Sequence, residues 1–178
     1  MTKDELRALI RTVPDFPAPG VLFRDVTTLL SDGRGFQAAV RHLADRAVEA
    51  GAQAIAGIEA RGFLFGAAVA ARLGLGFVPV RKPGKLPVAT IGVDYALEYG
   101  IDRLEIDAQA VGDGQRIVLI DDLLATGGTA RAAAQLLRQA GAQVDHALFV
   151  IDLPDLGGAL RLRAEGIRVD ALMDFPGV

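Results

Sequence analysis

The sequence predicts an α/β fold with a mostly parallel central sheet flanked by helices. Short apolar runs of strand length alternate along the chain with longer segments of helical periodicity. Several of these runs are apolar throughout, which is typical of strands buried on both faces of a parallel sheet. Hydrophobic residues make up 51% of the 178 residues, so the chain can bury one sizeable core between such layers.

The N-terminal part begins with a short helix and a proline-rich loop. Leu6, Leu9 and Ile10 recur at helical spacing, which predicts an amphipathic helix over residues 3–12. Three prolines and a glycine follow closely, and they predict that residues 13–25 have no regular structure. This segment also carries aromatic and aliphatic side chains, so we expect a fixed loop that is buried or meets a ligand.

Regular alternation begins at residue 36. Phe36, Val40 and Leu43 lie on one face of a helix that ends near Ala50, where Gly51 provides a stop. The expected strands beyond it are 52–58, 76–80, 116–120, 144–151 and 167–173, and the expected helices are 62–73, 128–140 and 156–165.

Residues 81–106 interrupt this alternation. They contain prolines, glycines, many charges and both tyrosines of the chain. We expect a long excursion, in the form of a twisted hairpin. An excursion of this length in a compact domain is typical of a functional lid or a disordered segment.

Composition excludes several classes of function. A formal net charge of −3 does not favour nucleic acid or an anionic membrane as a partner. The chain has no cysteine, and its two histidines are far apart, so neither a disulfide framework nor a structural zinc site is expected. The N-terminus lacks an apolar signal segment, and the longest charge-free apolar run, 62–71, is too short to span a bilayer. We therefore expect a soluble cytoplasmic protein.

The strongest functional motif is RIVLIDDLLATGGTA, residues 116–130. An apolar strand leads into Asp121 and Asp122, and a short turn then brings Thr-Gly-Gly-Thr to the start of a helix. Glycines let the backbone approach a phosphate closely, and the N–H groups at a helix start favour an anion. Ligands of open parallel sheets bind at the carboxyl ends of the strands. The alternative is purely structural, with Asp122 and the threonines capping the helix and the glycines making a tight turn.

This motif resembles the PRPP-binding signature of the type I phosphoribosyltransferase family, where PRPP is 5-phospho-α-D-ribose 1-diphosphate. The resemblance implies the fold of that family. It also implies that Asp121 and Asp122 hold the ribose hydroxyls. The loop that would cradle the 5′-phosphate consists of Ala125, Thr126, Gly127, Gly128 and Thr129.

Two further segments resemble the adenine-specific branch of the family. IEARGFLFG (58–66) is similar to its pyrophosphate loop, which implies a cis peptide between Glu59 and Ala60 and a pyrophosphate-binding, catalytic Arg61. VPVRKPGKLP (78–87) is similar to the segment whose cations meet pyrophosphate, some of them from a neighbouring subunit. The pyrophosphate-binding residues implied are Arg61, Arg81, Lys82 and Lys85. Taken alone, Arg61 would be an ordinary surface charge and 81–85 a solvated face.

The base pocket and the catalytic loop also follow from the resemblance. FPAPGVLFRDVTTLL (16–30) is similar to the branch's N-terminal hood, which corresponds here to residues 1–35. The adenine-binding residues implied are Val21, Phe23, Arg24 and Leu153, with Phe23 stacking on the purine and Val21 and Arg24 acting mainly through backbone groups. DYALEYG (94–100) resembles the flexible catalytic loop of this branch. The resemblance implies that its glutamate, here Glu98, takes part in proton transfer at adenine. Without the resemblance, Glu98 would be a solvated loop charge, and the hood segment a packed proline-rich loop.

The resemblance therefore implies a purine-salvage enzyme that forms AMP and pyrophosphate from adenine and PRPP. Mg²⁺ is the expected cofactor, held by PRPP and water without a direct protein ligand, and a homodimer is the expected assembly. We expect one compact domain, with a hood over residues 1–35 and a core over 36–178 that includes a mobile loop, 81–106. The alternatives are a transferase for hypoxanthine, guanine or xanthine, a non-catalytic PRPP-sensing regulator, and a plain structural domain.

Overall fold

A parallel sheet forms the centre of the protein, as expected. The computed structural model describes residues 1–97 and 100–177, and in this part of the chain the sheet has five strands. Their order is β4-β3-β7-β8-β9, and every neighbouring pair is parallel. The strands span Gly76–Val80, Ala54–Ile58, Arg116–Leu124, Gln143–Asp152 and Arg168–Asp174 in that order.

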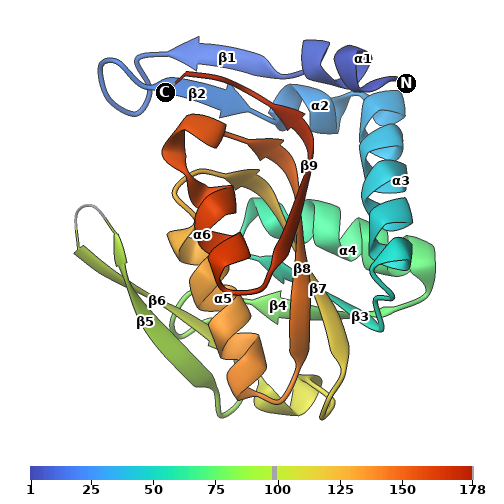
Figure 1. Ribbon diagram of the computed structural model, residues 1–178, viewed down its shortest axis with the longest axis vertical. Coiled ribbons are helices and arrows are strands. Elements are labelled where there is room, and N and C mark those ends of the chain that lie inside the picture. Colours follow the sequence, from blue (N-terminus) through green and yellow to red (C-terminus); the bar gives the residue numbers. More distant parts are fainter. Residues whose placement is uncertain (98–99, 178) are drawn as a thin grey trace.

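Helices cover both faces of this sheet (Figure 1). On one face, α3 (Gly33–Glu49) and α4 (Arg61–Leu73) bury a cluster that includes Leu43 and Phe65. On the other face, α5 (Gly128–Gln139) and α6 (Gly158–Ala164) bury alanines and leucines against the strands. Among the described residues, no helix is both long and apolar enough to cross a membrane.

The order of the strands reverses between β3 and β7. From β3 the chain passes through α4 to β4 on one side, whereas from β7 it passes through α5 to β8 and β9 on the other. The two connections leave a crevice at the carboxyl ends of β3 and β7, because α4 and α5 cover opposite faces of the sheet. Open α/β sheets bind their ligands at such a switch point.

The hood is more regular than the sequence predicts. It consists of α1 (Lys3–Ala8), β1 (Arg11–Pro14), β2 (Leu22–Asp25) and α2 (Thr27–Ser31), which lie together at one end of the molecule beside the C-terminal segment (Figure 1). The predicted helix over 3–12 is wrong beyond Ala8, and the expectation of no regular structure over 13–25 is wrong at both ends. The reason is long-range pairing, since β1 and β2 are antiparallel partners and the prolines fall at or beyond the end of β1.

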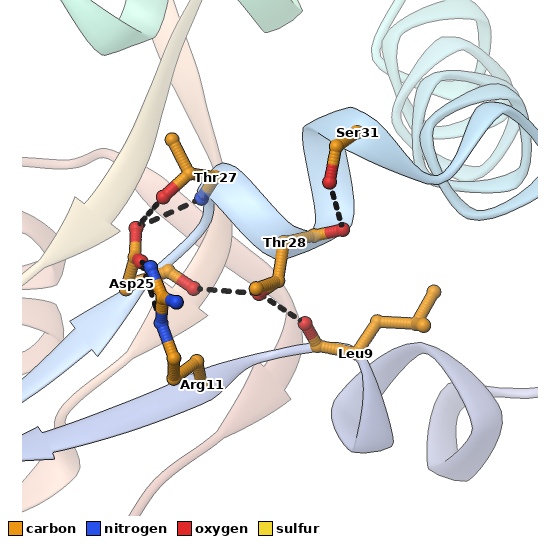
Figure 2. A network of polar contacts seen from close by, with 6 residues as sticks. All are labelled: Leu9, Arg11, Asp25, Thr27, Thr28 and Ser31. Carbon is orange, nitrogen blue, oxygen red and sulfur yellow. Dashed lines mark hydrogen bonds and ion pairs between the residues drawn. The ribbon is translucent and has the colours of Figure 1, made fainter.

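A polar network ties the two hood strands to α2, as Figure 2 shows. Asp25 accepts hydrogen bonds from the Thr27 hydroxyl and amide and from the Arg11 guanidinium. Thr28 donates its hydroxyl to the Leu9 carbonyl at 2.5 Å. The Thr27 hydroxyl, the Thr27 amide and Arg11 together lower the pKa of Asp25 from 3.8 to about 2.

The excursion after β4 is a hairpin, which confirms the sequence interpretation. Strands β5 (Ile91–Leu97) and β6 (Gly100–Ile106) pair antiparallel, and β5 packs on α5. Leu104 and Ile106 are fully buried, so the base of the hairpin belongs to the core. Residues 98–99, which follow β5 in the sequence, lie outside the described part of the chain.

In the described residues, two short 3₁₀ helices complete the fold, at Ala108–Ala110 and Pro154–Leu156. The second includes Leu156, the first residue of the helix predicted over 156–165, and α6 begins only at Gly158. Gly157 between them has a φ of 73°, a left-handed conformation that breaks the helical run.

Candidate active site

A cavity of about 310 Å³ lies at the switch point of the sheet. We call it the site cavity. It brings together the carboxyl ends of β3 and β7, the first turns of α4 and α5, and one lysine that follows β4. Its lining comprises Ile58, Glu59, Ala60, Arg61, Lys82 and residues 121–130.

The two acids of the motif lie within β7 rather than after it. The predicted strand ended at residue 120, but β7 continues to Leu124 because its pairing with β8 extends that far. Asp122 is only 5% exposed and accepts a hydrogen bond from Arg61 Nε at 2.5 Å. The pKa of Asp121 lies well above its usual value, because burial disfavours its charged form and the Asp122 carboxylate adds repulsion. Both acids line the site cavity, where their oxygens can accept hydrogen bonds from hydroxyl groups.

The five residues from Ala125 to Thr129, which we call the phosphate loop, line the cavity next to these acids. Gly127 is the N-cap of α5, with a φ of 85° and no side-chain cap. The alternative in which Asp122 or a threonine caps this helix is therefore wrong. Within the described residues, the first N–H groups of α5 have no hydrogen-bond partner, and such groups bind anions well.

A second glycine fixes the position of the phosphate loop. Gly158 donates its amide hydrogen to the Ala125 carbonyl at 3.1 Å. A Cβ on Gly158 would meet that same oxygen well inside contact distance, and would lie 3.0 Å from the Gly127 nitrogen. Sequence reasoning missed this position, because the close approach of α6 to the phosphate loop is a tertiary contact.

Two of the four predicted pyrophosphate-binding cations line the cavity, namely Arg61 and Lys82. Arg81 instead donates to Glu59 Oε2 at 3.2 Å and to the Lys85 carbonyl at 3.0 Å. Neither Arg81 nor Lys85 lines the cavity within the described residues. The peptide between Glu59 and Ala60 is cis, as the resemblance implies.

Glu59 was not predicted as a functional side chain. Its Oε2 atom accepts from the Arg81 guanidinium and from the Lys82 amide, at 3.2 and 2.9 Å. It therefore joins the end of β3 to the start of the basic segment after β4. The sequence signal was its place beside Arg61, but its partners lie more than twenty residues away.

Three of the four predicted adenine-binding residues lie in the hood, and Leu153 directly follows β8. The Phe23 ring lies 5.8 Å from the Arg61 guanidinium carbon, which brings the hood next to the site cavity. Val21 is 40% exposed, whereas Leu153 is buried and donates its amide hydrogen to the Leu124 carbonyl at 2.9 Å. None of the four lines the cavity in the part of the chain that the structure describes.

The side chain of Arg24 is committed to the hood. It donates to Thr12 Oγ1 at 2.6 Å and to the Pro176 carbonyl at 3.3 Å, and it stacks over Phe175. Any contact of Arg24 with a base would therefore come from its backbone. Glu98, the predicted proton-transfer residue, lies outside the described residues.

The fold and the site together define a phosphoribosyltransferase. Residues 27–159 match the phosphoribosyl transferase domain family. A protein of Novosphingobium aromaticivorans named adenine phosphoribosyltransferase is 71% identical, over 99% of both chains. The chain belongs to the adenine phosphoribosyltransferase family.

Solved structures agree with this assignment. The crystal structure of the adenine phosphoribosyltransferase from Thermoanaerobacter pseudethanolicus is 48% identical, with a TM-score of 0.92 over 98% of this chain and 100% of that one. The Saccharomyces cerevisiae enzyme, 38% identical with a TM-score of 0.89, covers 96% of this chain and 98% of its own. It was crystallised with adenine and an imino-altritol 1,6-bisphosphate.

Proposed function

We propose that this chain forms AMP and pyrophosphate from adenine and PRPP. The observation that carries the proposal is the site cavity, in which two acids, a helix N-terminus and an arginine meet at the switch point of the sheet. A sugar with phosphates at both ends needs acceptors for its hydroxyl groups and hydrogen-bond donors for its phosphate oxygens. The yeast relative, which binds adenine together with a bisphosphate of a cyclic imino sugar, supports the same pair of ligands.

The ribose 5-phosphate would be held by the phosphate loop and the two acids. The N–H groups of the phosphate loop and of the first turn of α5 would bind the 5′-phosphate, and Asp121 and Asp122 would accept the ribose hydroxyls. These contacts lie away from the reacting carbon. Their binding energy therefore orients the sugar for the displacement at C1.

The departing diphosphate would meet Arg61 and Lys82, which line the same cavity. In the described structure each of these cations already pairs with a carboxylate, so the protein alone offers the diphosphate little net positive charge. This fits a requirement for Mg²⁺, which would be held by PRPP and water. When bound, Mg²⁺ would neutralise charge on the leaving group. Arg61 and Lys82 would then stabilise the remaining negative charge.

Adenine would enter next to Phe23, whose ring lies by Arg61. We propose that Phe23 stacks on the purine, that the backbones of Val21 and Arg24 bind its edge, and that Leu153 closes the pocket. Glu98 would accept the proton of adenine as N9 attacks and return it in the reverse reaction. Arg81 and Lys85 are proposed to bind pyrophosphate as well, from positions next to Glu59 and the hairpin.

We further propose that the protein acts as a cytoplasmic homodimer. The support for the dimer is the resemblance to the adenine branch, in which some cations come from a neighbouring subunit. In the part of the chain that the structure describes, Arg81 and Lys85 lie outside the lining of the site cavity, which fits a role toward a second subunit. Light scattering at several protein concentrations would test the assembly.

A panel of bases tests the function directly. The purified protein would be incubated with PRPP, Mg²⁺ and one of adenine, hypoxanthine, guanine or xanthine, and nucleotide formation followed. We expect AMP from adenine and no comparable product from the other bases. Formation of a different nucleotide would agree with the family but would show that the adenine-binding residues are wrongly assigned. PRPP binding without any product would instead favour a PRPP-sensing regulator.

A further inference from the structure

The hairpin places a carboxylate on one cation of the site cavity. Lys82 Nζ donates to Asp102 Oδ2 and, at 3.3 Å, to the hydroxyl of Tyr95. Tyr95 and Asp102 are cross-strand partners of β5 and β6, and the Tyr95 hydroxyl donates to Asp102 Oδ2 at 3.0 Å. The three side chains therefore form a polar triangle at the edge of the site, and the Tyr95 hydroxyl also accepts a hydrogen bond from Thr129 Oγ1 at 3.5 Å.

This ion pair differs in origin from the one that Arg61 makes. Arg61 pairs with Asp122, which itself lines the site cavity and is proposed to bind ribose. Asp102 comes from the hairpin, and the lining of the cavity, within residues 1–97 and 100–177, includes Lys82 but not Asp102. The proposed mechanism gives Asp102 no contact with substrate, so its pairing with Lys82 needs a separate explanation.

Both partners of the contact are charged at neutral pH. Partial burial opposes ionisation of Asp102, but hydrogen bonds from Lys82, the Arg103 amide and Tyr95 outweigh it and lower the pKa of this carboxyl. The charge of Lys82 is therefore largely compensated. An approaching diphosphate would meet this compensated cation and the repulsion of Asp102.

We propose that Asp102 competes with diphosphate for Lys82 and thereby sets the affinity of the pyrophosphate subsite. Its carboxylate takes the place at Lys82 that a diphosphate oxygen would take, so binding exchanges one anion for another. The inference rests on the proposed function, because it assumes that Lys82 meets pyrophosphate. It also means that diphosphate binding removes a contact that holds the hairpin, whose two strands flank Glu98 in the sequence.

The test compares Asp102→Asn with Asp94→Asn. Asp94 lies on the same hairpin, is 62% exposed and pairs with Arg103 at 2.9 Å, so its substitution makes the same charge change away from Lys82. Calorimetry would measure the binding of inorganic pyrophosphate with Mg²⁺ and, separately, of AMP. We expect Asp102→Asn to bind pyrophosphate about two- to fivefold more tightly, the range expected for a partly exposed ion pair. AMP binding should stay unchanged, and Asp94→Asn should match the wild type for both ligands.

Unchanged or weaker pyrophosphate binding by Asp102→Asn would overturn the proposal, since a residue that merely orients Lys82 or supports the hairpin would give that result. Asp102→Ala makes the same charge change and serves if the asparagine variant does not fold. In a Lys82→Met background, Asp102→Asn should have no effect on pyrophosphate. If the wild type bound neither pyrophosphate nor AMP, the proposed function itself would be wrong. This outcome is distinct from failure of the Asp102 proposal, in which the wild type binds both ligands and Asp102→Asn does not bind pyrophosphate more tightly.

Discussion

Arg61 Nε donates to Asp122 Oδ2 at 2.5 Å, and this bond joins the first residue of α4 to β7 across the switch point of the sheet. The arginine comes from the proposed pyrophosphate loop and the carboxylate from the proposed ribose site. The side chains proposed to bind the diphosphate and the ribose of PRPP are thus hydrogen-bonded to each other. A change at either one is expected to affect both functions.

Arg61→Lys should therefore reduce kcat/KM for PRPP by about a hundredfold or more, the loss typical when a donor to developing charge is removed. A guanidinium can donate to Asp122 and to a phosphate at once, whereas an ammonium lacks that fixed fork. Steady-state kinetics with adenine and PRPP would measure the loss. Arg72→Lys, at the far end of the same helix, is the matched control and should behave as wild type. If Arg61→Lys had the same kcat/KM as Arg72→Lys, the proposed role of Arg61 would be wrong.

Glu98→Gln should lower turnover strongly while leaving the affinity for PRPP largely intact. The amide keeps the shape of the side chain but cannot accept the proton of adenine. Single-turnover measurements would give the rate of AMP formation, and a titration with PRPP would give the affinity. Wild-type turnover in this variant would contradict the proposed proton-transfer role.

Asp121→Asn should stabilise the protein and weaken its ligand binding. Burial raises the pKa of Asp121, so at neutral pH the folded state bears a cost for ionisation that the unfolded state does not. That cost is absent at pH values below the pKa of Asp121 in the unfolded chain. It grows as the pH rises toward the higher pKa of Asp121 in the folded protein. We therefore expect a Tm above that of the wild type at pH 7.5, with the difference narrowing toward pH 4, and PRPP binding weaker by about tenfold or more. If Asp121→Asn had a lower Tm than the wild type at pH 7.5, the Asp121 side chain would stabilise the folded state rather than destabilise it.

The sequence predicted the parts of the site that are local in the chain. The β7–α5 motif contains its strand, acids, glycines and helix start within fifteen residues, so a single segment supplies residues 121–130 of the cavity lining. The hood strands were missed because each is stabilised by a partner some ten residues away rather than by its own pattern. Asp102 was missed for the same reason, since its contact with Lys82 depends on the register of β5 and β6.

Gly158→Ala should disturb the phosphate loop without touching a substrate-binding side chain. The added Cβ would collide with the Ala125 carbonyl and lie 2.9 Å from Leu124 Cδ1, so the backbone of the loop must move. We expect a lower Tm and AMP binding weaker by about tenfold, measured by calorimetry. Gly33→Ala is the control, since its Cβ would meet nothing within 4 Å and alanine favours a helix start. Wild-type AMP affinity in Gly158→Ala would show that the loop tolerates the shift.

Asp25→Asn should destabilise the hood in a pH-dependent way. The carboxylate accepts from Thr27 and Arg11, and these bonds hold its pKa at about 2, below the value of 3.8 expected for an unfolded chain (Figure 2). A depressed pKa stabilises the folded state at pH values above 3.8, and this contribution is lost as the pH falls toward 2. The difference in unfolding free energy between wild type and variant should therefore be largest near neutral pH, about 1 to 2 kcal/mol for a charged hydrogen-bonded group. It should shrink steadily below pH 4 in urea titrations followed by circular dichroism. A difference that stayed constant from pH 7 to pH 3 would mean that the charge of Asp25 does not stabilise the hood, and that only the shape of its side chain matters there.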